Sequence, residues 1–287
     1  MSDGSMSVGR PFAYNVPCMN DAVVTNRNWW DALADRHGRG DDDYYDVDAF
    51  LSGESSLTER ERTEVAAAAG DVSGLDLLHL QCHFGLDTLS WAREGAQATG
   101  VDFSAVAVER ARKLAAEAKL SAEFVESDVL ALPESLSGRF DVVFASYGVL
   151  CWIRSAAEWM ASAAACLRPG GSLVLIDMHP LVTMTDTVEP LVVDFPYAGE
   201  RPVRFSNSSS YAVNELSPQT TETVQYPHGI GEVVSAVASA GLRVESLTEW
   251  FDEDIDPKLV RSPDGRMRFP FGDQWLPTSY GLRARRP

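Results

Sequence analysis

The stretch LLHLQCHFGLDTL, residues 77–89, decides the fold of this 287-residue chain. Its first five residues form a short apolar run typical of a buried strand. A polar turn follows and leads through Gly85 into a segment with helical spacing. A strand, a tight turn and a helix are the opening of a βαβ unit, so this stretch predicts a parallel sheet.

Apolar runs of strand length recur along the chain, with amphipathic helical segments between them. We predict seven strands, at residues 77–81, 98–102, 122–125, 140–146, 172–177, 242–249 and 278–285. Ser104 is the expected cap of the helix after the second strand, and Ser155 with Glu158 forms a capping box for the helix before the fifth. That helix is expected to close at residues 168–171, which read RPGG, and a last helix covers 231–240. The predicted fold class is α/β: a Rossmann-like, seven-stranded, mostly parallel sheet with helices on both faces.

Two segments depart from this alternation of strands and helices. Residues 1–65 are expected to form a polar leader and an N-terminal helical cap, in which Asn26 caps one helix and Thr58 with Glu61 forms a capping box for another. Residues 66–287 then form the α/β domain. Within it, from about 181 to 228, apolar residues alternate with polar ones and prolines. This pattern predicts an antiparallel insertion after the fifth strand, in the position of a substrate lid.

Charge and hydropathy exclude several classes of partner. The chain has 24 Lys and Arg against 42 Asp and Glu, a net charge of −18. A surface this acidic repels phosphate backbones and anionic lipids, so we expect no nucleic-acid partner and no membrane partner. The longest strongly apolar stretch, Val142–Ile153, is too short to cross a bilayer, and the opening MSDGSMSVGRP lacks the apolar core of a signal peptide. We therefore expect a cytoplasmic enzyme or binding protein.

Polar residues follow the first three strands, where an open parallel sheet binds its ligands. The turn from Gln81 to Gly85 leads into a helix whose free N–H groups can seat a carboxylate. Asp102 ends the second strand 21 residues after Gln81, close to the spacing at which an acid accepts two ribose hydroxyls. After the third strand, Asp128 can accept from an adenine amino group while the Val129 N–H meets a ring nitrogen. Three neighbouring strand ends thus predict one nucleoside site.

Five segments together resemble the class I S-adenosylmethionine-dependent methyltransferases, and specifically a bacterial subgroup whose first loop reads LQCHFGLDTL. The segments are NRNWWD (26–31), LLHLQCHFGLDTL (77–89), GVDFS (100–104), FDVVFASYGVLCWI (140–153) and LRPGGSLVLIDMHP (167–180). The broader family has an acidic-x-Gly-x-Gly-x-Gly loop, whose acid and first two glycines fall here on His79, Gln81 and His83; Gly85 alone matches. The resemblance implies S-adenosylmethionine as cofactor. The residues expected to bind it are Gln81, Cys82, His83, Gly85, Asp102, Phe103, Ser104, Asp128, Val129, Ser146 and Tyr147.

The function expected from this resemblance is methyl transfer to an oxygen or nitrogen atom of a small-molecule acceptor. Two alternatives share the strand-end acids: an NAD-dependent oxidoreductase and a non-catalytic protein that binds S-adenosylmethionine or a nucleoside. A dinucleotide needs close backbone approach to its pyrophosphate, which glycine permits. Gln81 and His83 instead place side chains there, and this favours a smaller ligand that carries a carboxylate.

Aromatic and histidine side chains are the candidates for the acceptor side. Among Trp29, Trp30, Tyr44 and Tyr45, we expect Trp30 and Tyr45 to cover the sulfonium or the adenine, since aromatic faces attract cations. The expected catalytic residues are His179, His228 and Tyr147, the two histidines as general bases, and the expected substrate contacts are Trp152, His179, Tyr211 and His228. Each of these side chains also fits a structural role.

Two other chemistries find less support in the same residues. His79, Cys82 and His83 have no second ligand pair at zinc spacing, so we expect no metal. Cys82 has no Cys-His-Asn pattern around it and fits a small packing residue better than a nucleophile.

Overall fold

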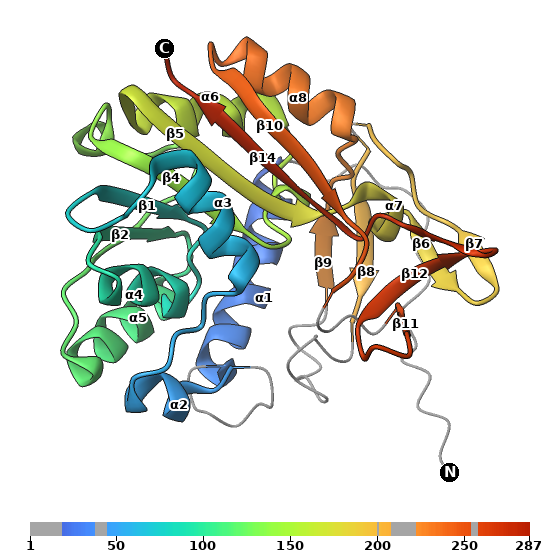
Figure 1. Cartoon of the computed structure of the whole chain (residues 1–287), viewed down its shortest axis with the longest axis horizontal. Helices are drawn as coiled ribbons and strands as arrows, with labels where there is room; N and C mark the ends of the chain where they lie inside the picture. The colour runs from blue at the N-terminus through green and yellow to red at the C-terminus, as the bar shows by residue number, and fades with distance from the viewer. Residues whose placement is uncertain (1–18, 38–44, 200, 208–221, 254–257) are drawn as a thin grey trace.

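A seven-stranded sheet forms the centre of the molecule (Figure 1). The computed structural model describes residues 19–37, 45–199, 201–207, 222–253 and 258–287. The strand order is β10-β14-β5-β4-β1-β2-β3, and β1 to β5 pair in parallel with their neighbours, whereas β14 runs antiparallel to both β5 and β10. The strands are β1 (Asp76–Leu80), β2 (Gln97–Asp102), β3 (Glu123–Glu126), β4 (Phe140–Ser146), β5 (Leu167–Met178), β10 (Arg243–Trp250) and β14 (Ser279–Arg285). The predicted fold class is confirmed.

Helices cover both faces of this sheet (Figure 1). They are α1 (Met19–His37), α2 (Val47–Ser52), α3 (Glu59–Ala69), α4 (Leu86–Arg93), α5 (Ala105–Ala118), α6 (Ala156–Cys166), α7 (Pro180–Thr183) and α8 (Ile230–Ser239), with short 3-10 turns η1 (Glu134–Leu136) and η2 (Leu150–Trp152). Alternate strand residues serve the two faces: Leu78 packs in one buried cluster with α6 and α8, and Leu77 packs in another with α3 and α4. Strands buried on both sides need continuous apolar runs, which explains the pattern in the sequence. Within the described residues, no helix combines the length and apolar character needed to cross a membrane.

The RPGG segment, residues 168–171, does not close a helix as predicted. Helix α6 ends at Cys166, and β5 begins at once with Leu167. Gly171 lies so close to β4 that a Cβ added to it would be 2.9 Å from the carbonyl oxygen of Phe140. The glycine is therefore needed for close strand pairing rather than for a helix end.

Helix α1 also differs from its prediction. It begins at or before Met19, so Asn26 lies in its interior and does not cap it. The buried Asn26 side chain instead forms two hydrogen bonds with the backbone of Val224: Nδ2 donates to the carbonyl at 2.8 Å, and Oδ1 accepts from the N–H at 2.8 Å. The predicted capping box of Thr58 and Glu61 is present at the start of α3, and this helix runs to Ala69, past the expected boundary at residue 65.

Antiparallel strands form two insertions, which lie on one side of the sheet beyond the end of β5 (Figure 1). The first, as predicted, follows β5 and contains the pairs β6 (Thr185–Val188) with β7 (Leu191–Val193) and β8 (Val203–Ser206) with β9 (Glu222–Gln225). The second was not predicted. It lies between β10 and β14 and consists of β11 (Val260–Arg261), β12 (Met267–Phe271) and β13 (Gln274–Leu276), which we call the C-terminal flap.

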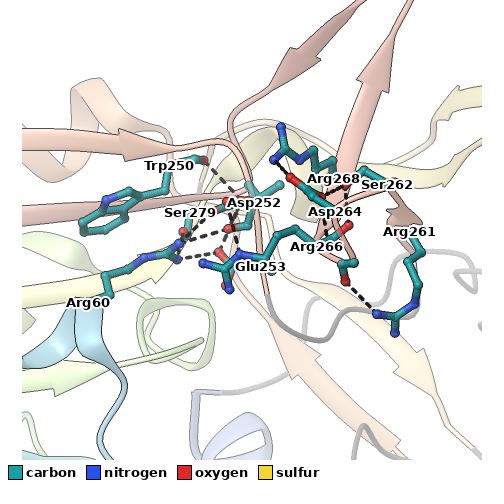
Figure 2. Close-up of polar contacts among 12 residues, drawn as sticks. Arg60, Trp250, Asp252, Glu253, Arg261, Ser262, Asp264, Arg266, Arg268 and Ser279 are labelled. Atoms are coloured by element: carbon teal, nitrogen blue, oxygen red, sulfur yellow. Dashed lines mark hydrogen bonds and ion pairs between the residues drawn. The ribbon is translucent and has the colours of Figure 1, made fainter.

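Arg60 of α3 ties the helical cap to the segment that leads into the C-terminal flap (Figure 2). Its guanidinium lies over the Trp250 ring, 4.5 Å from the centroid, and forms ion pairs with Asp252 at 3.1 Å and Glu253 at 3.0 Å. It also donates to the Ser279 hydroxyl at 2.9 Å. With its side chain only 14% exposed, Arg60 is well placed to fix α3 against the end of β10.

Candidate functional site

A cavity of about 540 Å³ opens at the carboxyl ends of β1 to β4, with α1 on its outer side. This is the edge at which an open parallel sheet binds ligands. Most of the predicted site residues line it: Trp30, Tyr45, Gln81, Cys82, His83, Gly85, Asp102, Phe103, Asp128, Val129, Ser146, Tyr147 and Trp152. The strand-end reasoning therefore brings together side chains that are far apart in the sequence.

The bend after β1 has the left-handed backbone conformation that usually requires glycine, although only one of its three left-handed residues is a glycine. Gln81 has φ 55°, His83 has φ 51° and Gly85 has φ 83°, all in the left-handed region. A non-glycine residue pays about 1–2 kcal/mol for this conformation. Gln81 offsets the cost with its side chain, whose Nε2 donates to the Val149 carbonyl at 3.0 Å and whose Oε1 accepts from Trp159 Nε1 at 2.8 Å. The amide of Gln81 thus joins the bend to the loop after β4 and to α6.

Gly85 cannot carry a side chain here. A Cβ at this position would be 2.6 Å from Cε1 of Phe124. Helix α4 starts directly after it, and the Gly85 cap provides no side-chain hydrogen bond to the first turn. Because Gly85, Leu86 and Asp87 all line the cavity, the free N–H groups of this turn are available to an anionic ligand group.

An aromatic and imidazole cluster covers this bend. His83 Nε2 lies 2.9 Å from Nδ1 of His37, a distance at which one imidazole donates to the other. Burial lowers the pKa of His37 to about 4 and that of His83 well below its usual range. Both rings are therefore neutral at physiological pH. Trp30 lies edge-on to His83 with ring centroids 5.2 Å apart, and Tyr45 lies 6.0 Å from His83.

Asp102 is held rigidly at the end of β2. One carboxylate oxygen accepts from the His83 N–H at 2.9 Å and the other from the Ser104 N–H at 2.9 Å. Burial raises the pKa of Asp102 to about 6, so the group is ionised at neutral pH at some energetic cost. A carboxylate has about four lone-pair positions. Asp102 therefore keeps acceptor capacity for two hydroxyl donors in the cavity.

The third strand contributes the next part of the wall. Asp128 and Val129 both line the cavity, and Asp128 Oδ1 accepts from the Leu130 N–H at 2.9 Å. Phe103, which follows Asp102, faces the same space. Two acids at neighbouring strand ends, with an aromatic ring near them, form a pocket suited to a base and a ribose.

The loop after β4 is shaped by Asp177. This buried carboxylate accepts backbone N–H groups from Gly148 at 2.6 Å, Met178 at 2.8 Å and Leu150 at 3.1 Å. Burial raises its pKa. The clamp fixes the loop that carries Tyr147 and Trp152 into the cavity.

Tyr147 lies beside the buried Glu61 of the cap, which in turn lies near Asp87 of α4. Burial, and then the neighbouring Asp87, raises the pKa of Glu61 to about 7. The pKa of Tyr147 is also raised, first by burial and then by Glu61, so its hydroxyl stays protonated. This side chain can donate a hydrogen bond to a ligand but does not act as a base at neutral pH.

Three of the predicted residues lie outside this cavity. Ser104 is fully buried and caps α5, where its hydroxyl accepts from the Ala107 N–H at 3.0 Å. His179 caps α7: its Nδ1 accepts from the Leu181 N–H at 3.2 Å and its Nε2 lies 2.9 Å from Glu249. His228 uses one nitrogen on the Ile153 carbonyl at 2.7 Å and the other on Glu232 at 2.9 Å. Both histidines thus have both ring nitrogens engaged with other protein groups; the two partners of His228 themselves line the cavity. Tyr44 and Tyr211 fall outside the described residues.

Other residues of the cavity wall were not predicted. Asp87 had a usable signal, because it lies in the first turn of the helix that the bend leads into. Tyr226 had none, because it lies in the insertion and reaches the site only through tertiary contacts. The remaining unpredicted lining residues are Ala22, Val23, Asn26, His79, Phe84, Leu86, Val101, Ser127, Leu130, Gly148, Val149, Ile153, Arg154, Ser155, Glu158 and Glu232.

Cys82 is placed as a packing residue. Its Sγ would be 2.7 Å from a Cβ added to Gly100, so the thiol fills the space that this glycine leaves open. Burial raises the pKa of the Cys82 thiol well above its usual value, and the nearby Asp102 adds to the effect. A thiol of this kind is a poor nucleophile. In the described part of the chain, no group of three His, Cys, Asp or Glu residues is arranged to hold a metal ion.

Comparison with known proteins matches the central part of the chain to methyltransferases. Residues 77–171 match a family model described as a methyltransferase domain. A demethylmenaquinone methyltransferase of Lactococcus lactis is 32% identical over 146 residues, which are 48% of this chain and 55% of that protein. A ubiquinone biosynthesis O-methyltransferase of Alkalilimnicola ehrlichii is 31% identical over 115 residues, 40% of this chain and 46% of the relative. The chain thus spans about half the length of these curated relatives.

Solved structures show the same fold over more of the chain. A putative S-adenosylmethionine-dependent methyltransferase from Listeria monocytogenes aligns with a TM-score of 0.54 at 16% identity, over 79% of this chain and 96% of that one. The magnesium protoporphyrin IX methyltransferase from Synechocystis, solved with bound SAH, aligns with a TM-score of 0.53 at 16% identity, over 93% of this chain and all of the other. The chain therefore has the Rossmann-like methyltransferase fold, and its residues 77–171 match the methyltransferase-domain model.

Proposed function

We propose that this protein transfers a methyl group from S-adenosylmethionine to an oxygen or nitrogen atom of a small-molecule acceptor, and that it belongs to the bacterial subgroup with the LQCHFGLDTL loop. The observation that carries the proposal is the shared cavity. The bend at residues 81–85, Asp102 and Asp128 come from three neighbouring strand ends and line one space. The methyltransferase-domain match covers this same part of the chain.

The residues present fit the cofactor. Asp102 has acceptor positions left for two ribose hydroxyls after it has accepted the His83 and Ser104 N–H groups. The first turn of α4, uncapped by any side chain, suits the carboxylate of the amino-acid tail. The left-handed backbone at Gln81 and His83 keeps the bend open to that tail without the family's glycines. Asp128 and Val129 are then placed for the adenine edge.

When bound, S-adenosylmethionine supplies a methyl group that its sulfonium has already activated. The task left to the protein is placement, and holding reactants in line contributes on the order of 7–11 kcal/mol. Tyr147 and Trp152 stand on the loop that Asp177 clamps, so their positions are fixed before any ligand arrives. Trp30 and Tyr45 cover the bend and exclude water from it.

Proton removal is a lesser requirement. A base typically contributes about 100- to 10,000-fold, and only when the acceptor is protonated at working pH. The hydrogen bonds of His179 and His228 favour structural roles for both. Tyr147, whose pKa is raised, is suited to orient the acceptor by donating a hydrogen bond. We therefore assign most of the catalytic effect to orientation.

Two measurements test this function. Titration calorimetry with S-adenosylmethionine, SAH and NAD should show binding of the first two and none of NAD. Transfer of a labelled methyl group to a panel of small phenols and amines should then separate an enzyme from a non-catalytic binder. Binding of NAD in preference to S-adenosylmethionine would refute the proposal.

A further inference from the structure

The part of the cavity beyond the expected cofactor has a distinct wall. Helix α1 presents Ala22 and Trp30 on one side, eight residues apart and thus on one helical face. Trp152 and Ile153 come from the loop after β4, and Tyr226 follows β9. We call this wall, made of Ala22, Trp30, Trp152, Ile153 and Tyr226, the acceptor compartment.

Two tryptophans form a corner in the acceptor compartment. The ring centroids of Trp30 and Trp152 are 5.3 Å apart, and their planes meet at 81°. Both side chains are partly exposed because they face the cavity. A flat ring that stacks on one of them presents its edge to the other, and both arrangements are favourable for aromatic pairs.

The same wall offers few hydrogen-bonding groups beyond the indole N–H groups of Trp30 and Trp152 and the hydroxyl of Tyr226. Asn26 lies on the compartment face of α1, but both atoms of its amide are already bonded to the Val224 backbone. The carbonyl of Ile153 is bonded to His228. A sugar or another polyol would lose its water here without enough polar partners, which is costly.

Charges occur only at the rim of this part of the cavity lining. Arg154 and Glu158 are exposed, and Glu232 lies close to them on the lining, so both signs are present. A mixed rim selects neither an anion nor a cation by itself. The shape and chemistry of the tryptophan corner therefore decide what binds.

We infer that the methyl acceptor is a flat aromatic molecule, such as a phenol or a fused-ring alcohol, whose ring lies in the corner of Trp30 and Trp152. This inference rests on the proposed function for the position of the cofactor. Tyr147 lines the same cavity and is the proposed hydrogen-bond donor to the acceptor's oxygen. A cationic amine is the main competitor, because aromatic faces also attract cations.

The test compares probes that differ in aromaticity and in charge. Calorimetry on the full chain saturated with SAH measures binding of 1-naphthol, of decahydro-1-naphthol, which has the same carbon framework without the rings' π-systems, and of N,N-dimethylcyclohexylamine. We expect 1-naphthol to bind about five- to tenfold more tightly than either other probe. Equal binding of the saturated alcohol, or tighter binding of the amine, would overturn the inference.

Substitutions of Trp152 test whether the preference for 1-naphthol arises at the tryptophan corner. Trp152→Leu should reduce the preference for 1-naphthol to about twofold, whereas Trp152→Phe should retain most of it. Trp275→Leu is the matched control, since Trp275 lies 39% exposed on β13 in the C-terminal flap, outside the cavity lining. An unchanged preference in a folded Trp152→Leu protein would also refute the inference.

The measurements separate this inference from the proposed function. SAH affinity is measured on each variant and should stay within about twofold of wild type. If SAH failed to bind the wild-type chain, the proposed function would fail, and the 1-naphthol titration without SAH would still test the corner. If SAH bound normally and 1-naphthol did not, only the aromatic acceptor would be refuted.

Discussion

Asp102→Asn separates a functional acid from a structural one. The substitution keeps the shape of the side chain but removes its charge and one of its two acceptor oxygens. In the wild type those oxygens accept the His83 and Ser104 N–H groups, each at 2.9 Å. If Asp102 served only to hold the bend, the variant should lose stability and keep its affinity for S-adenosylmethionine. If Asp102 binds the ribose, the variant should lose affinity for S-adenosylmethionine and keep most of its stability.

The size of the stability effect follows from the pKa. Burial raises the pKa of Asp102 from 3.8 to about 6, and two pH units correspond to about 3 kcal/mol. Because the folded pKa is the higher one, the folded protein holds the proton more tightly, and this group lowers stability as pH rises from about 4 to 6. Above pH 6 the full cost applies. Asparagine removes that cost and leaves one N–H poorly paired, at about 1–3 kcal/mol. The two effects nearly cancel, so at pH 8 the free energy of unfolding should change by less than about 2 kcal/mol.

The effect on cofactor affinity should be larger. Hydrogen bonds to a charged acceptor contribute about 1.5–3 kcal/mol, so loss of one weakens binding about ten- to 150-fold. Calorimetry at pH 8 measures this directly. At pH 5 the wild-type Asp102 is largely protonated, given its pKa of about 6, and the wild type should lose affinity between pH 8 and 5 where the variant does not. Unchanged affinity with a large loss of stability would show that the ribose lies elsewhere.

Four further substitutions and one control test the rest of the site and its anchor. Gly85→Ala should lower the free energy of unfolding by about 2–4 kcal/mol in denaturant melts, because φ is 83° and the new Cβ would lie 2.6 Å from a ring carbon of Phe124 in β3. The control Gly138→Ala, at φ 63° with open space around it, should lower it by about 1 kcal/mol. Arg60→Ala should cost about 1–3 kcal/mol by the same measurement, since it leaves Glu253 without its cation and Asp252 with Arg266 alone, and an unchanged melt would refute the anchoring role. His179→Gln and His228→Gln should leave kcat within about twofold, and a loss above a hundredfold in either would restore that histidine as a base.

The strand ends were predictable because local sequence decides them. An apolar run buried on both faces can only be a central strand, and the polar residue that follows it must lie at the sheet edge. Asp102 and Asp128 were found in this way, and both line the cavity. The order of the strands then brings them to one cavity without any further information from the sequence.

The contacts between distant segments were not predictable. Asn26 has the residue type of a helix cap, yet it lies inside α1 because Val224 offers two backbone groups that only tertiary packing brings near. His179 and His228 have the residue type of a base, yet hydrogen bonds to both nitrogens of each ring hold them in structural positions. The C-terminal flap was missed for the same reason, since its three short strands pair with one another and, through Met267, with Glu253, and none of them joins the central sheet.

The cap and the insertions act as one wall because two side chains join them. Asn26 fixes α1 to β9, and Arg60 fixes α3 to the segment between β10 and the flap (Figure 2). The residues next to these anchors face inward: Trp30 lies one turn beyond Asn26 and lines the cavity, while Glu61 follows Arg60 and lies beside Tyr147. Each anchor therefore sets the position of a side chain at the site. Under the proposed function, the strand-end acids at the sheet edge bind the cofactor, and the anchored segments surround the acceptor. The cofactor half of the site can therefore be predicted from local sequence, whereas the acceptor half depends on tertiary contacts and can vary independently.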